Sequence, residues 1–467
     1  MADLGASTPL AGPPPATWRD ELAALVRLAG PLVGANLLQM AVYAVDVMFV
    51  ARLGPVPFAA STLGVFLLSL IMWALIGFTG ACAPIIAAEL GRRTHAVREV
   101  RRSFRMAMWL GAFASVIFML VLGQGERILL ALGQDPEVSE RSGAFLDILL
   151  WVMLPNVWAG VMRTVAAALG RQGWAIGVTA MALGLNLLGN WLLVFGHGGF
   201  PALGLEGSAI ASCVTALAMM LAWGAILRFD PKLRRYRLFG NWWRSEWRRL
   251  REIARLGAPI AFTFTLEGAL FGGAAFLMGL IGVIQVDAHA IALNIAAVAF
   301  QIPFGIAQAA TIRVGMAYGA RDQRWIARAG WVAIVLGTGF MLVTAGAIWV
   351  APRLFVSAYV DVDDPAHAAT VALAIQYLAV AAMFQLFDGA QAVAAGALRG
   401  IQDTRMPMVI AGFGYWIAGF GTAIWLGFSA GWEGVGIWVG LAVGLLVVSA
   451  LLVARWSMRA RLGLLPA

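Results

Sequence analysis

Apolar runs of about 20 residues recur along the whole 467-residue chain, and this pattern constrains the fold most. Each run is long enough to cross a bilayer as a helix. Only 12% of the residues are charged, against about 25% in soluble proteins. A spanning segment must satisfy its own backbone hydrogen bonds, which leaves helices and closed barrels. The runs are too long and too continuous for barrel strands, so we predict an all-α integral membrane protein.

We predict twelve transmembrane helices from these runs. The expected spans are approximately 24–50, 58–86, 105–124, 143–166, 174–196, 204–228, 254–281, 288–316, 326–350, 371–396, 406–428 and 432–455.

An internal repeat divides these spans into two halves. RLAGP at Arg27–Pro31 recurs as RLGAP at Arg255–Pro259, and at the same offset Gly77 matches Gly305. Six spans separate the repeats, and six is even, so the halves share one orientation. The sequence therefore predicts two parallel six-helix bundles, a plan found in transporters. Pro31 and Pro259, in the first helix of each half, are either candidate kinks or prolines tolerated near a helix start.

The predicted organisation has five parts. They are an N-terminal tail with an interfacial entry (1–23), an N-terminal bundle (24–228), a basic cytoplasmic linker (229–253), a C-terminal bundle (254–455) and a C-terminal tail (456–467). The tryptophans and arginines of the linker suit an amphipathic helix on anionic headgroups. We expect contact with membrane lipids and none with nucleic acid.

The basic residues predict the orientation. Of the 33 lysines and arginines, all but Arg52, Arg127, Arg141 and Arg353 fall on one side of the predicted spans. Loops rich in such residues stay in the cytoplasm. We therefore expect both termini in the cytoplasm and the chain in a bacterial inner membrane.

Asp46, Glu267 and Asp388 are carboxylates that lie inside otherwise apolar stretches of the predicted spans. A charge in the hydrocarbon core costs at least about 2.5 kcal/mol, so such residues usually face a cavity and serve function. Glu267 and Asp388 lie 12 and 11 residues from Arg255 and Arg399. At the helical rise of about 1.5 Å per residue, both sit near mid-membrane at the same depth. Asp46 stands roughly 10 Å nearer the outside.

Five segments around these acids resemble the multidrug and toxic compound extrusion (MATE) family, in its NorM-type bacterial branch. They are AVDVMFVARLG around Asp46, GHGGFPALGLEGSAIAS from Gly196, LEGALF around Glu267, QIPFGIAQAATIRVGMAYGARD from Gln301, and FQLFDGAQAVAAGALRGIQDTRMP from Phe384. The resemblance covers nearly the whole chain and implies that these acids couple drug export to inward Na⁺ or H⁺. The chain departs from the family at Asn190, near which many members carry an acidic residue.

We therefore predict a secondary multidrug antiporter, monomeric and not an enzyme, that exports amphipathic organic cations by alternating access. Glu267 and Asp388 would bind the coupling cation, as metal ligands if that ion is Na⁺, and Asp46 would bind a proton or the cationic substrate. We expect no cofactor besides the ion. The alternative for each acid is a protonated packing residue bonded to a neighbouring helix.

Four other polar residues lie within spans: Gln39, Asn36, Asn294 and Gln301. They could line the cavity or hold helices together. The alternative function is a flippase for lipid-linked oligosaccharides or another lipid-like substrate. A flippase should present basic residues to pyrophosphate, whereas the buried charges here are acidic.

Overall fold

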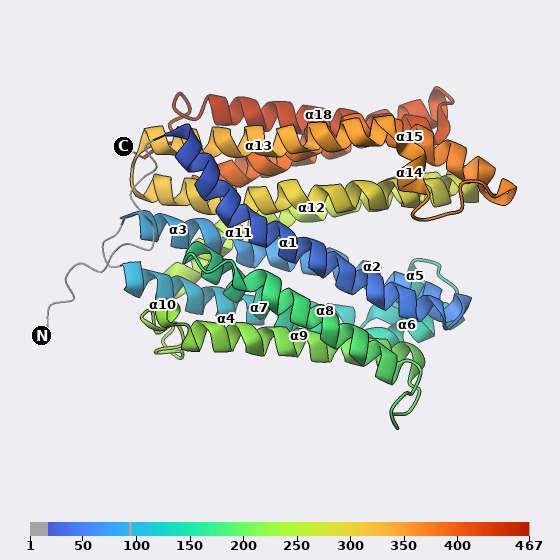
Figure 1. Ribbon diagram of the computed structural model, residues 1–467, viewed down its shortest axis with the longest axis horizontal. Coiled ribbons are helices and arrows are strands. Elements are labelled where there is room, and N and C mark those ends of the chain that lie inside the picture. Colours follow the sequence, from blue (N-terminus) through green and yellow to red (C-terminus); the bar gives the residue numbers. More distant parts are fainter. Residues whose placement is uncertain (1–16, 93–95, 467) are drawn as a thin grey trace, which may run out of the picture. The chain divides into compact units, whose positions relative to one another are not determined.

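The computed structural model describes residues 17–92 and 96–466, and Figure 1 labels most of the helices along them. This part of the chain is built of helices and turns, without strands, and twelve of its helical segments are long and apolar enough to cross a membrane. The predicted all-α membrane fold is confirmed. The predicted tail lies outside the described residues up to residue 16. The first helix, α1 (Trp18–Ala51), begins six residues before the predicted span.

The described chain forms two compact units, and the first helix of each half is shared between them. One unit is Gly34–Ala261, here called the N-unit. The other, the C-unit, joins the start of the chain up to Val33 to Phe262–Ala467. The first turns of α1 therefore belong with the C-terminal helices. The first turns of α11 (Trp247–Ile281) belong with the N-terminal ones.

The N-unit contains a core between α2, α6, α7 and α9 around Leu68, Phe145 and Met153. The predicted span 58–86 is interrupted near Ala81, and the predicted span 143–166 contains a short 3-10 turn, η1. The helices are α2 (Pro55–Gly80), α3 (Cys82–Arg92), α4 (Ala96–Leu122), α5 (Gly125–Ala131), α6 (Pro136–Leu149), η1 (Leu150–Val152), α7 (Met153–Ala168), α8 (Trp174–Leu193), α9 (Gly204–Phe229) and α10 (Pro231–Arg234).

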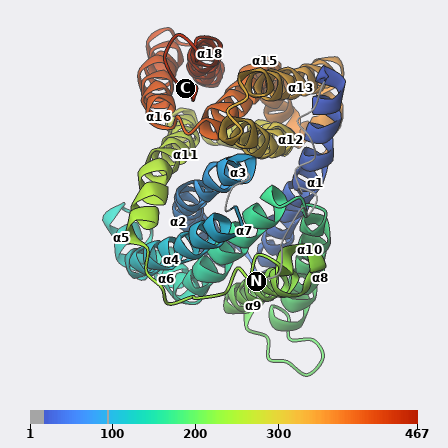
Figure 2. The same cartoon turned by 90° about the vertical axis from the view of Figure 1, so that its left-hand side faces the viewer.

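The C-unit packs α15 against α12, α13 and α18, and Figure 2 shows α12, α13 and α15 side by side. Its eleventh span contains two π-helical segments, η3 and η4. The elements are α12 (Val283–Gly319), α13 (Gln323–Val350), α14 (Pro352–Val356), η2 (Pro365–His367), α15 (Ala368–Gly400), α16 (Arg405–Gly412), η3 (Phe413–Phe420), α17 (Gly421–Ile424), η4 (Trp425–Ser429) and α18 (Glu433–Ser457).

Close backbone contacts hold the exchanged helix starts. Within the N-unit, a Cβ on Gly257 of α11 would lie 2.2 Å from the carbonyl oxygen of Phe78 on α2. Within the C-unit, a Cβ on Gly305 of α12 would lie 2.5 Å from the Val33 side chain on α1. Both distances are shorter than van der Waals contact, so only glycine lets these helix pairs approach.

The linker does not form the predicted amphipathic helix. Between α10 and α11 the chain runs through turns, with Arg237 and Asn241 in the left-handed region. Tyr236 and Leu238 are buried instead of lying on one face of a helix. Both residues are buried within the N-unit, where Arg101 also donates to the carbonyl of Tyr236 at 3.0 Å, and these contacts replace the predicted helix.

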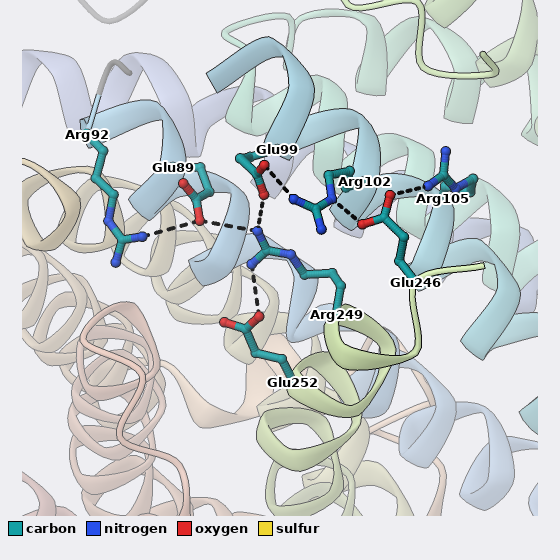
Figure 3. A network of polar contacts seen from close by, with 8 residues as sticks. All are labelled: Glu89, Arg92, Glu99, Arg102, Arg105, Glu246, Arg249 and Glu252. Carbon is teal, nitrogen blue, oxygen red and sulfur yellow. Dashed lines mark hydrogen bonds and ion pairs between the residues drawn. The ribbon is translucent and has the colours of Figure 1, made fainter. Parts of the chain in front are cut away.

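An ion-pair network joins the end of the linker and the start of α11 to α3 and α4 of the N-unit (Figure 3). Arg249 donates to Glu99 and, at 3.4 Å, to Glu89. Arg105, only 2% exposed, donates to Glu246 at 2.6 Å. The network consists of Glu89, Arg92, Glu99, Arg102, Arg105, Glu246, Arg249 and Glu252. It fixes the start of α11 on the N-unit.

Candidate cation sites and family membership

Asp46 lies in the N-unit part of α1 and accepts three side-chain hydrogen bonds. Asn186 and Asn190 of α8 donate to Oδ1 at 2.9 and 2.8 Å. Ser212 of α9 donates to Oδ2 at 3.0 Å. The two asparagines are fully buried and four residues apart, so they share one helix face. Asp46 thus joins α1, α8 and α9.

The donor set around Asp46 is neutral. Amide and hydroxyl groups stabilise a carboxylate by hydrogen bonding but do not neutralise its charge. A carboxylate held this way in a low-dielectric region can attract a proton or an organic cation. Asn190, the departure from the family pattern, therefore serves Asp46 as a hydrogen-bond donor.

Glu267 and Asp388 meet at one amide in the C-unit. Gln391 of α15 donates from Nε2 to Glu267 Oε1 at 3.0 Å and to Asp388 Oδ1 at 3.2 Å. Asp388 and Gln391 lie one helical turn apart and are 5% and 4% exposed. Gln391 thus brings the two acids of the C-unit together at one amide, whereas Asp46 belongs to the N-unit.

Tyr415 sets the orientation of the shared amide. Its hydroxyl donates to Gln391 Oε1, which turns Nε2 toward the acids. Tyr415 belongs to the π-helical segment η3 and is 1% exposed. Beside it, a Cβ on Gly414 would lie 2.3 Å from the Val448 side chain of α18. This close approach packs the wide π turn, a form often found at functional sites, against α18.

The C-unit arrangement suits a small cation or a proton. Two carboxylates near one another in a low-dielectric region cannot both remain charged and unpaired. Na⁺, a hard cation, would take the carboxylate oxygens, whereas the Gln391 atom that faces them is the donor Nε2. Within residues 17–92 and 96–466, no three His, Cys, Asp or Glu side chains gather as a metal site. Neutral oxygen ligands are therefore needed alongside the acids.

The other predicted polar residues are not linked to the acids by the hydrogen bonds described above. Asn294 and Gln301 of α12 donate to carbonyls four residues earlier, Ala290 and Ala297, at 2.9 and 3.3 Å. Asn36 is 6% exposed, and Gln39, half-buried, lies seven residues before Asp46 on α1. A role in lining a cavity stays a prediction for all four.

Pro31 and Pro259 lie inside continuous helices. The chain passes from one unit to the other just after each proline, at Val33–Gly34 and Ala261–Phe262. Since proline removes a backbone hydrogen bond within a helix, these positions suit a change of helix direction, and the kink stays a prediction.

Sequence reasoning missed the neutral partners of the acids: Asn186, Ser212, Gln391 and Tyr415. Helical spacing carries some signal, because Gln391 follows Asp388 by three residues and Asn190 follows Asn186 by four. Ser212 and Tyr415 contact their partners from other helices. The spacing of residues along one helix does not reveal such contacts.

Both halves of the chain are similar to known proteins. The family model MatE matches residues 31–192 and 259–425, one segment in each half of the repeat and together more than half of the chain. The chain belongs to the MatE family. Its NorM-type resemblance is borne out by a probable multidrug resistance protein NorM from Mesorhizobium japonicum, which is 45% identical over 95% of each chain. A protein of the same description from Brucella suis is 42% identical over 94% of this chain and 93% of its own.

The fold of this MatE protein also matches solved structures. A mutant of the Vibrio cholerae MATE transporter VcmN superposes with a TM-score of 0.86, over 95% of this chain and 98% of the other, at 16% identity. The relatives and structural neighbours are MATE transporters, which agrees with the prediction of a transporter and not an enzyme.

Proposed function

We propose that this MatE protein is a secondary multidrug efflux transporter that exchanges amphipathic organic cations for inward Na⁺ or H⁺. The observation that carries the proposal is the shared amide of Gln391, which joins Glu267 and Asp388. Two acids within membrane spans are costly unless a cation or proton binds to them. The names of the NorM relatives support multidrug export as the purpose of that exchange.

In this proposal the two units bind different ligands. Glu267 and Asp388 bind the coupling ion in the C-unit, and Asp46 binds a proton or the cationic substrate in the N-unit. If the bound ion weakens binding of the drug, the bound drug must weaken binding of the ion by the same factor, because the two binding equilibria are linked. The membrane potential adds about 2.3 kcal/mol per inward charge at 100 mV.

Alternating access would come from movement of one unit against the other, with Pro31 and Pro259 as candidate hinges. Their position just before the two boundaries between the units supports this role. Gln39, Asn36, Asn294 and Gln301 are candidate cavity residues. No cofactor is required, because the ion gradient supplies the energy.

We propose a monomer in the bacterial inner membrane with both termini in the cytoplasm. The distribution of the 33 basic residues supports that orientation. The domain limits 24–228 and 254–455 describe the repeats in sequence, whereas the compact units exchange their first helix turns.

The decisive experiment measures drug efflux from proteoliposomes with Na⁺ and H⁺ gradients imposed separately. At least one gradient should drive efflux in the wild type, and Asp388→Asn should abolish that response. Asp147→Asn is the matched control, because Asp147 is an exposed acid on α6. Efflux indifferent to both gradients would refute ion-coupled exchange.

A flippase for lipid-linked substrates remains the alternative function. It is weaker because the carboxylates at both sites would repel pyrophosphate. Transport of a lipid-linked pyrophosphate by the same vesicles would favour it.

A further inference from the structure

A second group of buried polar side chains surrounds Trp438 in the C-unit, away from the acid pair. His289 of α12 is 2% exposed and lies 5.4 Å from Trp438 between ring centroids. Tyr377 of α15 is fully buried and stacks on Trp438 at 6.3 Å. Within the described chain, neither ring nitrogen of His289, the hydroxyl of Tyr377 nor Nε1 of Trp438 has a hydrogen-bond partner.

Packing fixes where the Tyr377 hydroxyl lies. A Cβ on Gly434 of α18 would lie 1.9 Å from that oxygen, so the hydroxyl is seated against the backbone one turn before Trp438. Phe384 closes another side, 5.7 Å from Trp438 and 1% exposed. The unpartnered atoms thus belong to three aromatic rings, from three helices, that pack against one another.

Buried polar groups in proteins are almost always hydrogen-bonded, to protein or to ordered water. Four unpartnered atoms around one ring therefore indicate a ligand that both donates and accepts. Water fits, because a buried water commonly makes about three hydrogen bonds to otherwise unsatisfied groups. The neutral character of the tryptophan and tyrosine groups also argues against a fixed anion or metal.

The polar stripe on α15 links this group to the acid pair. Gln385, fully buried, follows Tyr377 by eight residues and precedes Asp388 by three, so the three side chains share one face. Its Oε1 accepts from Thr344 at 3.1 Å, and its Nε2 is another unpartnered buried atom. Tyr377 and Asp388 are separated by about 16 Å along the helix.

We propose that His289, Tyr377 and Trp438 bind ordered water, and that this water, continued past Gln385, forms a hydrated entry route for the coupling ion to Asp388. The route starts at the end of the C-unit where α12, α15 and α18 begin, which the basic-residue pattern places outside. This entry role rests on the proposed ion-coupled exchange. The water site itself does not.

The charges along the route favour a cation. Asp287 on α12 and Glu433 on α18 are exposed near its outer end, and Asp388 lies at its inner end. The remaining neighbour, α13, carries no charged residue between Arg328 and Val350. An entering cation therefore meets acids at both ends and neutral polar groups between them.

Hydroxyl-radical labelling by X-ray pulses tests the water site, because radicals formed from bound water modify the side chains beside it. In the purified, full-length protein, Trp438 and Tyr377 should be labelled several-fold faster than Trp223, an equally buried tryptophan of the N-unit. His289→Phe should lower labelling at both. Rates equal to that of Trp223 would overturn the proposal.

Transport tests the entry role. Tyr377→Phe removes only the hydroxyl and should slow gradient-driven efflux several-fold, whereas Tyr359→Phe, on an exposed tyrosine, should not. Strong labelling with unchanged efflux in Tyr377→Phe and His289→Phe would overturn the entry route. Wild-type efflux indifferent to any ion gradient would overturn the proposed function instead, and labelling would still decide the water site.

Discussion

Arg313 donates two hydrogen bonds to Glu21, from Nε at 2.8 Å and from Nη2 at 2.6 Å, and thereby ties the start of α1 to α12 within the C-unit. Glu21 is fully buried and also accepts from Trp325 Nε1 at 3.0 Å. The Arg313 guanidinium lies 5.3 Å from the Trp325 ring centroid. A buried acid in a hydrophobic region is thus fully partnered.

We expect Arg313→Met to destabilise the protein strongly, because it leaves Glu21 buried without a counter-charge. Removing one partner of a buried ion pair typically costs about 3–5 kcal/mol. Thermal unfolding in detergent would measure the loss. Arg324→Met, at an exposed position on α13, should change stability by less than about 0.5 kcal/mol. Equal effects would contradict the anchoring role.

Arg249 anchors α11 as Glu21 anchors α1, but with the opposite charge. The two residues are 228 apart, the offset of the repeat, and Arg249 contacts Glu89 and Glu99. Arg249→Glu should therefore destabilise the protein by about 3–5 kcal/mol, because it brings a fourth acid beside Glu89, Glu99 and Glu252. Arg248→Glu, exposed one residue earlier, is the control. Indistinguishable melting temperatures would refute the prediction.

Tyr415→Phe should weaken ion coupling less than loss of either acid. The variant frees the Gln391 amide to rotate but leaves both carboxylates in place. One hydrogen bond contributes about 1 kcal/mol, which corresponds to roughly a fivefold weaker apparent affinity for the ion. Efflux against ion concentration would show a shifted midpoint with a similar maximal rate. A lowered maximal rate alone would point to a different role.

Asp46→Asn should reduce export of a cationic drug at least about tenfold, the equivalent of about 1.4 kcal/mol. The variant keeps the side-chain shape but removes the charge that Asn186, Asn190 and Ser212 surround. Binding of a fluorescent cationic dye should weaken in parallel. Asp147→Asn serves as the control, and unchanged dye binding and efflux in Asp46→Asn would remove Asp46 from the site.

The pH dependence of stability should show a contribution from Asp230, which lies outside the spans. Burial alone would raise the pKa of Asp230, but hydrogen bonds from Arg171, the Lys232 amide and Trp174 hold it below the usual value. A depressed pKa stabilises the folded state above the unfolded pKa of about 3.9. That stabilisation is lost as pH falls through the lower, folded pKa.

We therefore expect Asp230→Ala to have a lower melting temperature than the wild type at neutral pH. The difference between the two melting temperatures should narrow on acidification below about pH 4. Melting curves in detergent across this range would measure it. Glu140→Ala, an exposed site on α6, should show no such convergence. A gap that is constant with pH would disprove the assignment.

The sequence predicts the spans, and it makes the acids within them easy to find, for one physical reason: both signals depend on the membrane. Any twenty apolar residues must form a helix there, and an acid such as Asp388 stands out against them. Counting residues from Arg255 and Arg399 placed Glu267 and Asp388 at one depth, and they do meet at Gln391.

The partners and the exchange of helix starts could not be predicted, because they depend on packing between helices. Tyr415 reaches Gln391 from a π-helical turn, and periodicity does not distinguish such a turn from an α-helix. The prediction of an amphipathic linker helix was wrong because Tyr236 and Leu238 are buried within the N-unit. Such tertiary packing cannot be read from the local sequence pattern.

The exchanged helix starts impose an order on biosynthesis. Glu21 leaves the ribosome 292 residues before its partner Arg313, which at about 5–20 residues per second is a wait of roughly 15–60 s. The start of α11 emerges after Glu89 and Glu99 and can dock at once. The first helix to be synthesised is therefore among the last to reach its final place. During that interval Glu21 has no Arg313 to pair with, and water, lipid or a chaperone must solvate its charge.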